Sequence, residues 1–97
     1  MHPTHIRDFN IPRAHAALDH LRSLAESDRA VAAELPRIES MVQRGEELAT
    51  LGLEQDNTMM IGEAVTLLEA PTLEAPPHVS MALYLAEWER TKGTTLD

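Results

Sequence analysis

The stretch DRAVAAELPRIESMVQRGEELATLG, residues 28–52, decides the fold class of this chain. Four apolar residues recur in it at spacings of four, three and four: Val31, Leu35, Ile38 and Val42. This spacing is typical of one face of an α-helix. Pro36 lies inside the repeat, where it removes one backbone hydrogen bond and clashes with the carbonyl four residues earlier. The pattern therefore predicts either one long helix kinked at Pro36 or two helices, the second of which begins at Pro36.

A second helical pattern precedes this stretch. Asn10 is a candidate N-cap, and Pro12 follows it in the first turn, where no amide donor is needed. The apolar face of this pattern consists of Ala14, Ala17, Leu18, Leu21, Leu24 and Ala25. Ser27 and Asp28 form another capping signal, which either restarts a helix or lies within a continuous one. We therefore expect a long kinked helix or a helical hairpin over 12–51.

Two shorter helices are predicted after this hairpin. Gly52 is a plausible end for the preceding helix, and Asp56 or Asn57 can cap the next one, TMMIGEAVTLLEA. Three prolines then follow within residues 71–77, and each biases the residue before it away from helical angles. We expect 71–77 to be a short, extended, proline-rich connector that ends where Pro77 opens the last helix.

The last predicted helix, PHVSMALYLAEWERTKG, is apolar around much of its circumference. Met81, Leu85 and Trp88 form one stripe along it. So wide an apolar arc is unusual for a surface helix of a small domain, so this helix is either the centre of the fold or packs against another chain. The candidate protein-interaction residues are Met81, Leu83, Tyr84, Leu85 and Trp88.

Composition supports a single helical domain. The chain has 97 residues, of which 43% are hydrophobic and 25% charged, which is too apolar for a disordered chain. Aromatic residues are only 3% of the chain, and the apolar residues are mostly alanine, leucine, valine, isoleucine and methionine. We predict an all-α bundle of three to five helices over residues 1–97, with an irregular tail over 1–9.

The location of the protein is constrained by what the sequence lacks. There is no cysteine, which excludes disulfides and thiolate chemistry and suits a reducing compartment. No apolar run approaches the length of a transmembrane helix, and the first ten residues lack the apolar core of a signal peptide. We expect a soluble, cytoplasmic protein with no membrane association.

Charge is distributed unevenly along the chain. Residues 1–44 contain six arginines and six acidic residues, whereas residues 45–97 contain two basic and ten acidic residues, so the whole net charge of −8 lies in the second part. Such asymmetry can align a partner or a second copy, although it is also compatible with an ordinary solvated surface. The charged residues of interest are Arg22, Arg29, Arg37, Arg44, Glu46 and Glu47.

Catalytic and metal-binding signals are absent from the sequence. His15 and Asp19 share a helical spacing, but two ligands do not make a metal site. Glu46 and Glu47 are adjacent and therefore point in different directions on a helix, which does not suit paired acid–base catalysis. No nucleophile, phosphate-loop or dinucleotide motif occurs. We expect no catalytic, cofactor or metal site, and no enzymatic activity.

These observations predict a small non-enzymatic protein-binding regulator, inhibitor or chaperone that docks through a helix face, with a protein partner or as a homodimer. The alternative is an acidic inhibitor of a nucleic-acid-binding protein, in which the second half of the chain imitates nucleic acid. Direct DNA binding through the four arginines is the least favoured reading, because the net charge of −8 opposes it.

Overall fold

In a computed structural model of the chain, which describes residues 5–82, 85, 88 and 89, every regular element is a helix. The elements in chain order are η1 (Ile6–Asn10), α2 (Ile11–Ala25), α3 (Arg29–Gln55), α4 (Thr58–Leu68) and α5 (Ala70–Leu73). Residues 77–82 are also helical. The predicted all-α bundle with one long helix is confirmed. None of the helices in this part of the chain is long and apolar enough to cross a membrane.

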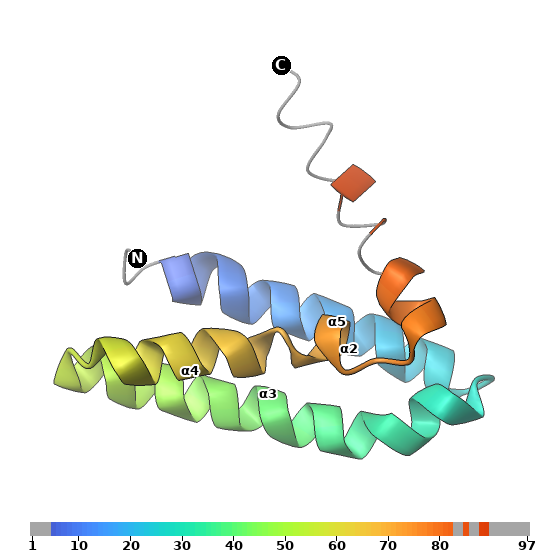
Figure 1. Cartoon of the computed structure of the whole chain (residues 1–97), viewed down its shortest axis with the longest axis horizontal. Helices are drawn as coiled ribbons and strands as arrows, with labels where there is room; N and C mark the ends of the chain where they lie inside the picture. The colour runs from blue at the N-terminus through green and yellow to red at the C-terminus, as the bar shows by residue number, and fades with distance from the viewer. Residues whose placement is uncertain (1–4, 83–84, 86–87, 90–97) are drawn as a thin grey trace.

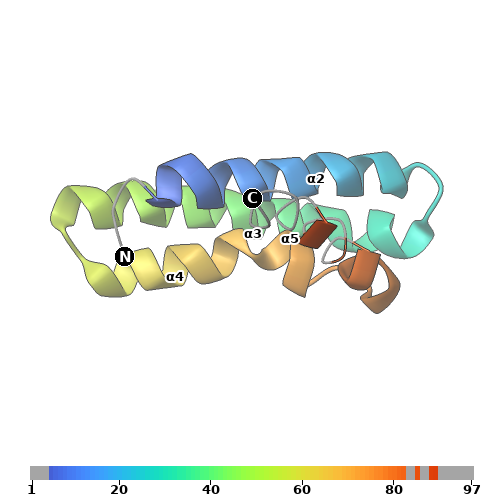
Figure 2. The same ribbon diagram turned by 90° about the horizontal axis from the view of Figure 1, so that it is seen from above.

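The bundle consists of three helices that run up, down and up again. Helix α3 packs against both α2 and α4, and the chain reverses direction at each of the two connections (Figures 1 and 2). With 27 residues, α3 is about 40 Å long and extends along the other two helices. Helix α5 lies at the end of α4 and contacts both α2 and α3.

Helix α3 runs through Pro36 without interruption, so Pro36 does not separate two helices. The proline ring leaves the carbonyl of Ala32, four residues earlier, without its helical donor. Both Pro36 and Ala32 are exposed to solvent, where water can hydrate that carbonyl. The apolar face on the other side continues past the proline, because Val31, Ile38 and Val42 are all buried.

The core forms where the predicted apolar faces meet. Helix α2 contributes Ala14, Leu18 and Leu21, and Ala64 and Leu68 of α4 are also buried. The remaining buried apolar residues are Ile6, Val31, Ile38, Val42, Leu48, Ala49, Ala70, Ala75 and Val79. Small alanine side chains are frequent in this set, and they allow neighbouring helices to approach closely.

Two glycines bring α3 and α4 together. A Cβ added at Gly52 would lie 2.9 Å from Cγ1 of Ile61, and one added at Gly45 would lie 3.1 Å from Cβ of Leu67. The prediction that Gly52 ends α3 is wrong, because the helix continues to Gln55 and Asp56 adopts the left-handed end conformation with φ of 51°. Gly52 is needed for packing rather than for helix termination.

The expected caps are confirmed at two of the three helix starts. Asp28 accepts hydrogen bonds from the amides of Ala30 and Val31, and Asn57 caps α4 in the same way. Asn10 makes no cap, because the chain is already helical before it. Its side chain is buried, and its Oδ1 atom has no hydrogen-bond partner in the part of the chain that the structure describes.

The expected irregular tail over 1–9 is wrong for the residues that can be described. Residues 6–10 form η1, in which the amide of Ile11 bonds to the carbonyl of Ile6. The reason is hydrophobic: the side chain of Ile6 is fully buried, which holds this first turn against the bundle.

The proline-rich connector is also more helical than predicted. Pro71 lies in the first turn of α5, a position that tolerates proline because its missing amide is not needed there. Only residues 74–76 are non-helical, and helical structure resumes at Pro77 as expected. The expectation of an extended 71–77 segment is therefore wrong for 71–73.

Candidate protein-interaction surface

The helical segment that begins at Pro77 is fixed to the bundle at its start. Ala75 and Val79 are buried in the core, with 7% and 3% of their surface exposed. The hydroxyl of Ser80 lies 2.5 Å from the carbonyl oxygen of Thr72 and 3.0 Å from that of Ala75. These contacts set the direction in which the chain leaves the bundle.

A hydrogen bond between two side chains adds a second attachment. Nε2 of His78 lies 2.8 Å from Oδ2 of Asp28, the residue whose other oxygen caps α3. Because an ionised carboxylate can only accept hydrogen bonds, Nε2 of the imidazole carries the proton. The hydrogen bond from His78, followed by the one from the Val31 amide, holds the pKa of Asp28 below its ordinary value. The turn between α2 and α3 is thereby tied to the start of the last helical segment.

Beyond these attachments, the large apolar side chains of the segment are exposed. Met81 is 60% exposed, Leu85 51% and Trp88 48%. Their spacing of four and three residues places them on one face of a helix. These three residues are the apolar stripe. The other two predicted interaction residues, Leu83 and Tyr84, lie outside the described residues.

A shallow groove lies beside the start of this segment. It has a volume of about 400 Å³ and is formed between the first turns of α3 and the proline-rich connector. Its lining residues are Ala30, Ala33, Glu34, Arg37, Glu74, Ala75, Pro76 and Pro77. The groove is therefore mostly apolar, with one arginine and two glutamates among its lining residues.

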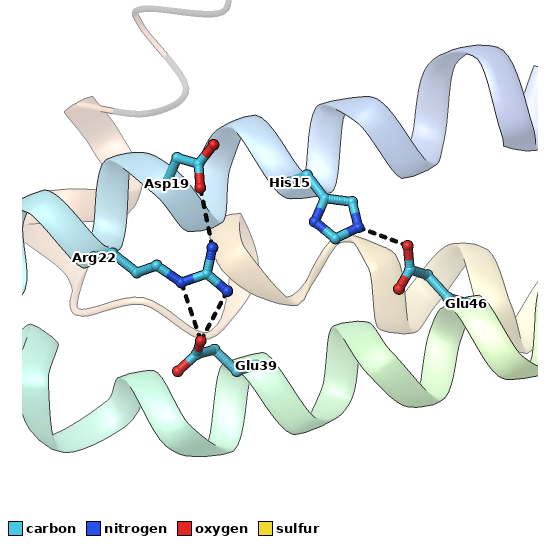
Figure 3. Close-up of polar contacts among 5 residues, drawn as sticks. All are labelled: His15, Asp19, Arg22, Glu39 and Glu46. Atoms are coloured by element: carbon cyan, nitrogen blue, oxygen red, sulfur yellow. Dashed lines mark hydrogen bonds and ion pairs between the residues drawn. The ribbon is translucent and has the colours of Figure 1, made fainter.

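The four arginines singled out in the sequence do not form one stripe. Arg22 belongs to α2, and the other three belong to α3. The Nε and Nη2 atoms of Arg22 lie 3.1 and 2.8 Å from Oε2 of Glu39, and its Nη1 atom lies 3.0 Å from Asp19 (Figure 3). The hydrogen bond to Glu39 raises the pKa of the Arg22 guanidinium. This arginine therefore links α2 to α3 and is not available as an isolated cation.

Two of the arginines on α3 are paired in the same way. Arg37 lies 2.5 Å from Glu34 and 3.6 Å from Glu74, and Arg44 lies 3.8 Å from Glu47. The hydrogen bond to Glu34 raises the pKa of Arg37.

The candidate metal ligands also have side-chain partners. His15 lies with Nε2 2.6 Å from Oε1 of Glu46, whereas Asp19 bonds to Arg22 (Figure 3). Within the described residues, no group of three or more potential ligands is placed to hold a metal ion. Glu46 faces α2 and Glu47 pairs along α3, so the two adjacent carboxylates have separate partners.

Several of these contacts could not be found in the sequence. His78 and Asp28 are separated by 50 positions, and nothing local connects them. The close approach of Gly45 to Leu67 and of Gly52 to Ile61 had one indication in the sequence. Two glycines seven residues apart lie on one face of a helix, which suggests that another helix packs closely there. Their partners on α4 depend on the hairpin geometry.

The fold and this surface define a small all-α bundle with an apolar helical stripe beside one end. Comparisons of the chain with protein-family models, with curated proteins and with solved structures find no match.

Proposed function

We propose that this protein is a small non-enzymatic regulator that binds another protein chain through the apolar stripe of Met81, Leu85 and Trp88. The observation that carries the proposal is the contrast in burial along one short segment. Val79 is 3% exposed and anchors the segment, whereas Met81, two residues later, is 60% exposed. Apolar side chains in a row on an anchored helix favour association, because covering them removes apolar surface from water.

The charged residues support a contact of this kind over nucleic-acid binding. Arg22, Arg37 and Arg44 are each paired with carboxylates of the same chain. A phosphate backbone would have to replace those partners, and the net charge of −8 would oppose its approach.

The alternative function, an acidic inhibitor of a nucleic-acid-binding protein, has less support than binding through the apolar stripe. Of the acidic residues in the second half of the chain, Glu47, Glu69 and Glu74 form ion pairs with arginines of the first half, and Glu46 has a hydrogen bond with His15. The charge asymmetry of the sequence is therefore partly neutralised inside the fold. A nucleic-acid mimic needs those carboxylates to face a partner.

Two substitutions test the proposed surface. Met81→Asp and Leu85→Asp each place a charge within the stripe without touching the buried anchors Ala75 and Val79. Wild-type and variant proteins are immobilised, and the proteins retained from the source-cell extract are quantified. We expect each variant to lose its specific partner by tenfold or more, because burying an unpaired carboxylate costs several kcal/mol.

A matched control is Ala16→Asp, which adds the same charge at an exposed position of α2. It should retain the partner. Light-scattering mass of each protein shows whether that partner is a second copy, in which case the wild type is a dimer and the stripe variants are monomers. Equal retention and equal mass for all four proteins would refute the proposal.

A further inference from the structure

Helix α4 presents a second surface, whose composition is unusual for a helix that faces solvent. Four exposed residues at spacings of three, one and three form this α4 outer face: Met59, Gly62, Glu63 and Thr66. Glu63 is the single charged residue of the whole helix. Met59 is 77% exposed, more than any other large apolar side chain in the described residues. Outward helix faces of small domains usually carry several charges.

Gly62 has no role in the packing of the described chain. A Cβ added there would meet nothing within 4 Å, whereas one added at Gly45 or Gly52 would collide with α4. Glycine inside a helix destabilises it by about 0.5–1 kcal/mol relative to alanine. Gly45 and Gly52 show that this chain uses helical glycine where another helix approaches closely. Gly62 offers the same feature on a face that no other element of the described chain covers.

Two acidic residues lie at the end where α3 meets α4, Glu54 in the last turn of α3 and Asp56 at its C-cap, and Glu63 lies on the face itself. Glu54, Asp56 and Glu63 have no ion pair within the described residues, in contrast to the paired glutamates elsewhere. This end of the bundle is opposite the end that bears residues 77–82 (Figure 1).

The charges decide what can occupy the face. A second copy would bring together two chains that each carry −8, and a two-fold contact centred on this face would place the two Glu63 side chains near each other. Like charges across a contact are unfavourable. A basic segment would instead supply partners for three carboxylates that have no ion pair in the described part of the chain. A helical partner fits a face made of Met59, Gly62 and Thr66. Such a helix can place one apolar side chain on the methionine and bring its backbone close to the glycine.

We propose that the α4 outer face binds a basic amphipathic helix of a partner protein. An apolar residue of that helix covers Met59, its backbone passes over Gly62, and lysine or arginine side chains pair with Glu54, Asp56 and Glu63. This site is separate from the apolar stripe and does not depend on the proposed function.

The test uses the full chain and two helical peptides of about 18 residues, long enough to form a helix on the protein. One peptide has leucines on one face and lysines on the other, and the second has glutamate in place of every lysine. Fluorescence anisotropy measures Kd, and backbone amide shifts map the contact. We expect the lysine peptide to shift amides of α4 around Gly62 and the glutamate peptide to bind at least tenfold more weakly.

Three variants make the test specific. Glu63→Gln should weaken binding by about two- to fivefold, the range of an exposed ion pair. Glu26→Gln removes the same charge from an exposed residue at the end of α2 that has no ion pair within the described part of the chain, and it should leave Kd unchanged. Gly62→Leu should weaken binding by about tenfold while raising the unfolding temperature, because it fills the approach path but improves helix propensity.

The proposal is overturned by any of four results. These are no binding of the lysine peptide, equal binding of both peptides, equal losses from Glu63→Gln and Glu26→Gln, or an unchanged Kd in Gly62→Leu. Amide shifts centred on residues 77–82 would also overturn it, because they would place the peptide on the other surface.

Discussion

The three helical glycines of the described chain meet different surroundings, and this difference predicts opposite effects of one substitution. Gly45→Ala and Gly52→Ala should each lower the free energy of unfolding by about 1–3 kcal/mol, because the new Cβ would lie 3.1 Å from Leu67 or 2.9 Å from Ile61. Gly62→Ala should raise it by about 0.5–1 kcal/mol. Urea unfolding followed by circular dichroism measures all three. If all three substitutions changed the free energy of unfolding in the same direction, the different surroundings of these glycines would be contradicted.

Asp28 predicts a dependence of stability on pH. Its folded-state pKa lies below the ordinary value of 3.8, so ionisation of this carboxylate favours the folded state. That contribution is fully present above the unfolded-state pKa and is lost as the pH falls through the folded-state pKa. Asp28→Asn keeps a good capping residue but loses the charge next to His78, so it should reduce the fall in stability on acidification.

Asn57→Ala is the matched control for Asp28. It removes the cap of α4, which should cost about 1 kcal/mol at every pH because no ionisable group is lost. Urea midpoints measured from pH 6 downwards compare the two variants with the wild type. If Asp28→Asn and the wild type lose stability in parallel on acidification, the hydrogen bond from His78 does not contribute as described.

At the residue scale, the sequence predicted what depends on neighbours along the chain. The caps at Asp28 and Asn57 follow from local hydrogen bonds to amides two and three residues later. The roles of Gly52 and Asn10 were wrongly predicted, because they depend on contacts with distant segments. The buried Ile6 extends the helix before Asn10, and Ile61 of α4 requires Gly52 to lack a side chain.

At the scale of elements, Pro36 predicts a gain in stability on replacement. Pro36→Ala restores the hydrogen bond to the carbonyl of Ala32 within an unbroken α3. Alanine also makes the unfolded chain more flexible than proline does, and this stabilisation of the unfolded state offsets part of the gain. We therefore expect the free energy of unfolding to rise by about 1–2 kcal/mol.

Pro71→Ala serves as the contrasting variant. Pro71 is fully buried in the first turn of α5, so its loss should remove packing and lower the free energy of unfolding by about 1 kcal/mol. Calorimetric or urea unfolding of both variants measures the difference. A loss of stability in Pro36→Ala would mean that the proline is needed for the shape of α3.

The helices themselves were largely predictable, and their boundaries less so. The apolar periodicity around Val31, Ile38 and Val42 was strong enough to indicate helix on both sides of Pro36. The sequence could not decide between one helix and two, because the answer depends on whether Pro36 faces solvent. Only the packing of α3 against its neighbours determines this. The sequence does not predict the helix at Ala70–Leu73, because proline commonly stops a helix although its ring also suits a first turn.

Across the whole molecule, the charge asymmetry of the sequence becomes a set of contacts between the two halves. Arg13 pairs with Glu69, Arg37 with Glu74 and Asp28 with His78, so acidic and basic residues of opposite halves meet in the folded chain. Composition predicted the net charge but not these pairings. Glu54 in the last turn of α3, Asp56 at its C-cap and Glu63 in α4 remain without ion pairs within the described residues.

The apolar stripe and the acidic end of α3 make the two ends of the bundle chemically different. Met81, Leu85 and Trp88 are exposed, and their role as a contact surface stays a prediction from their helical spacing. The anchoring of the stripe through Val79, Ser80 and the His78–Asp28 pair was not predictable, because each contact depends on the folded bundle.

Photo-crosslinking in the source cells can detect a contact between the apolar stripe and another protein chain. A photoreactive amino acid is placed at Leu85, and in a control protein at Ser40, an exposed residue of α3. We predict a discrete crosslinked product from position 85, larger by the mass of one partner or one further copy, and none from position 40. No product from position 85, or the same products from both positions, would contradict the proposed role of the stripe.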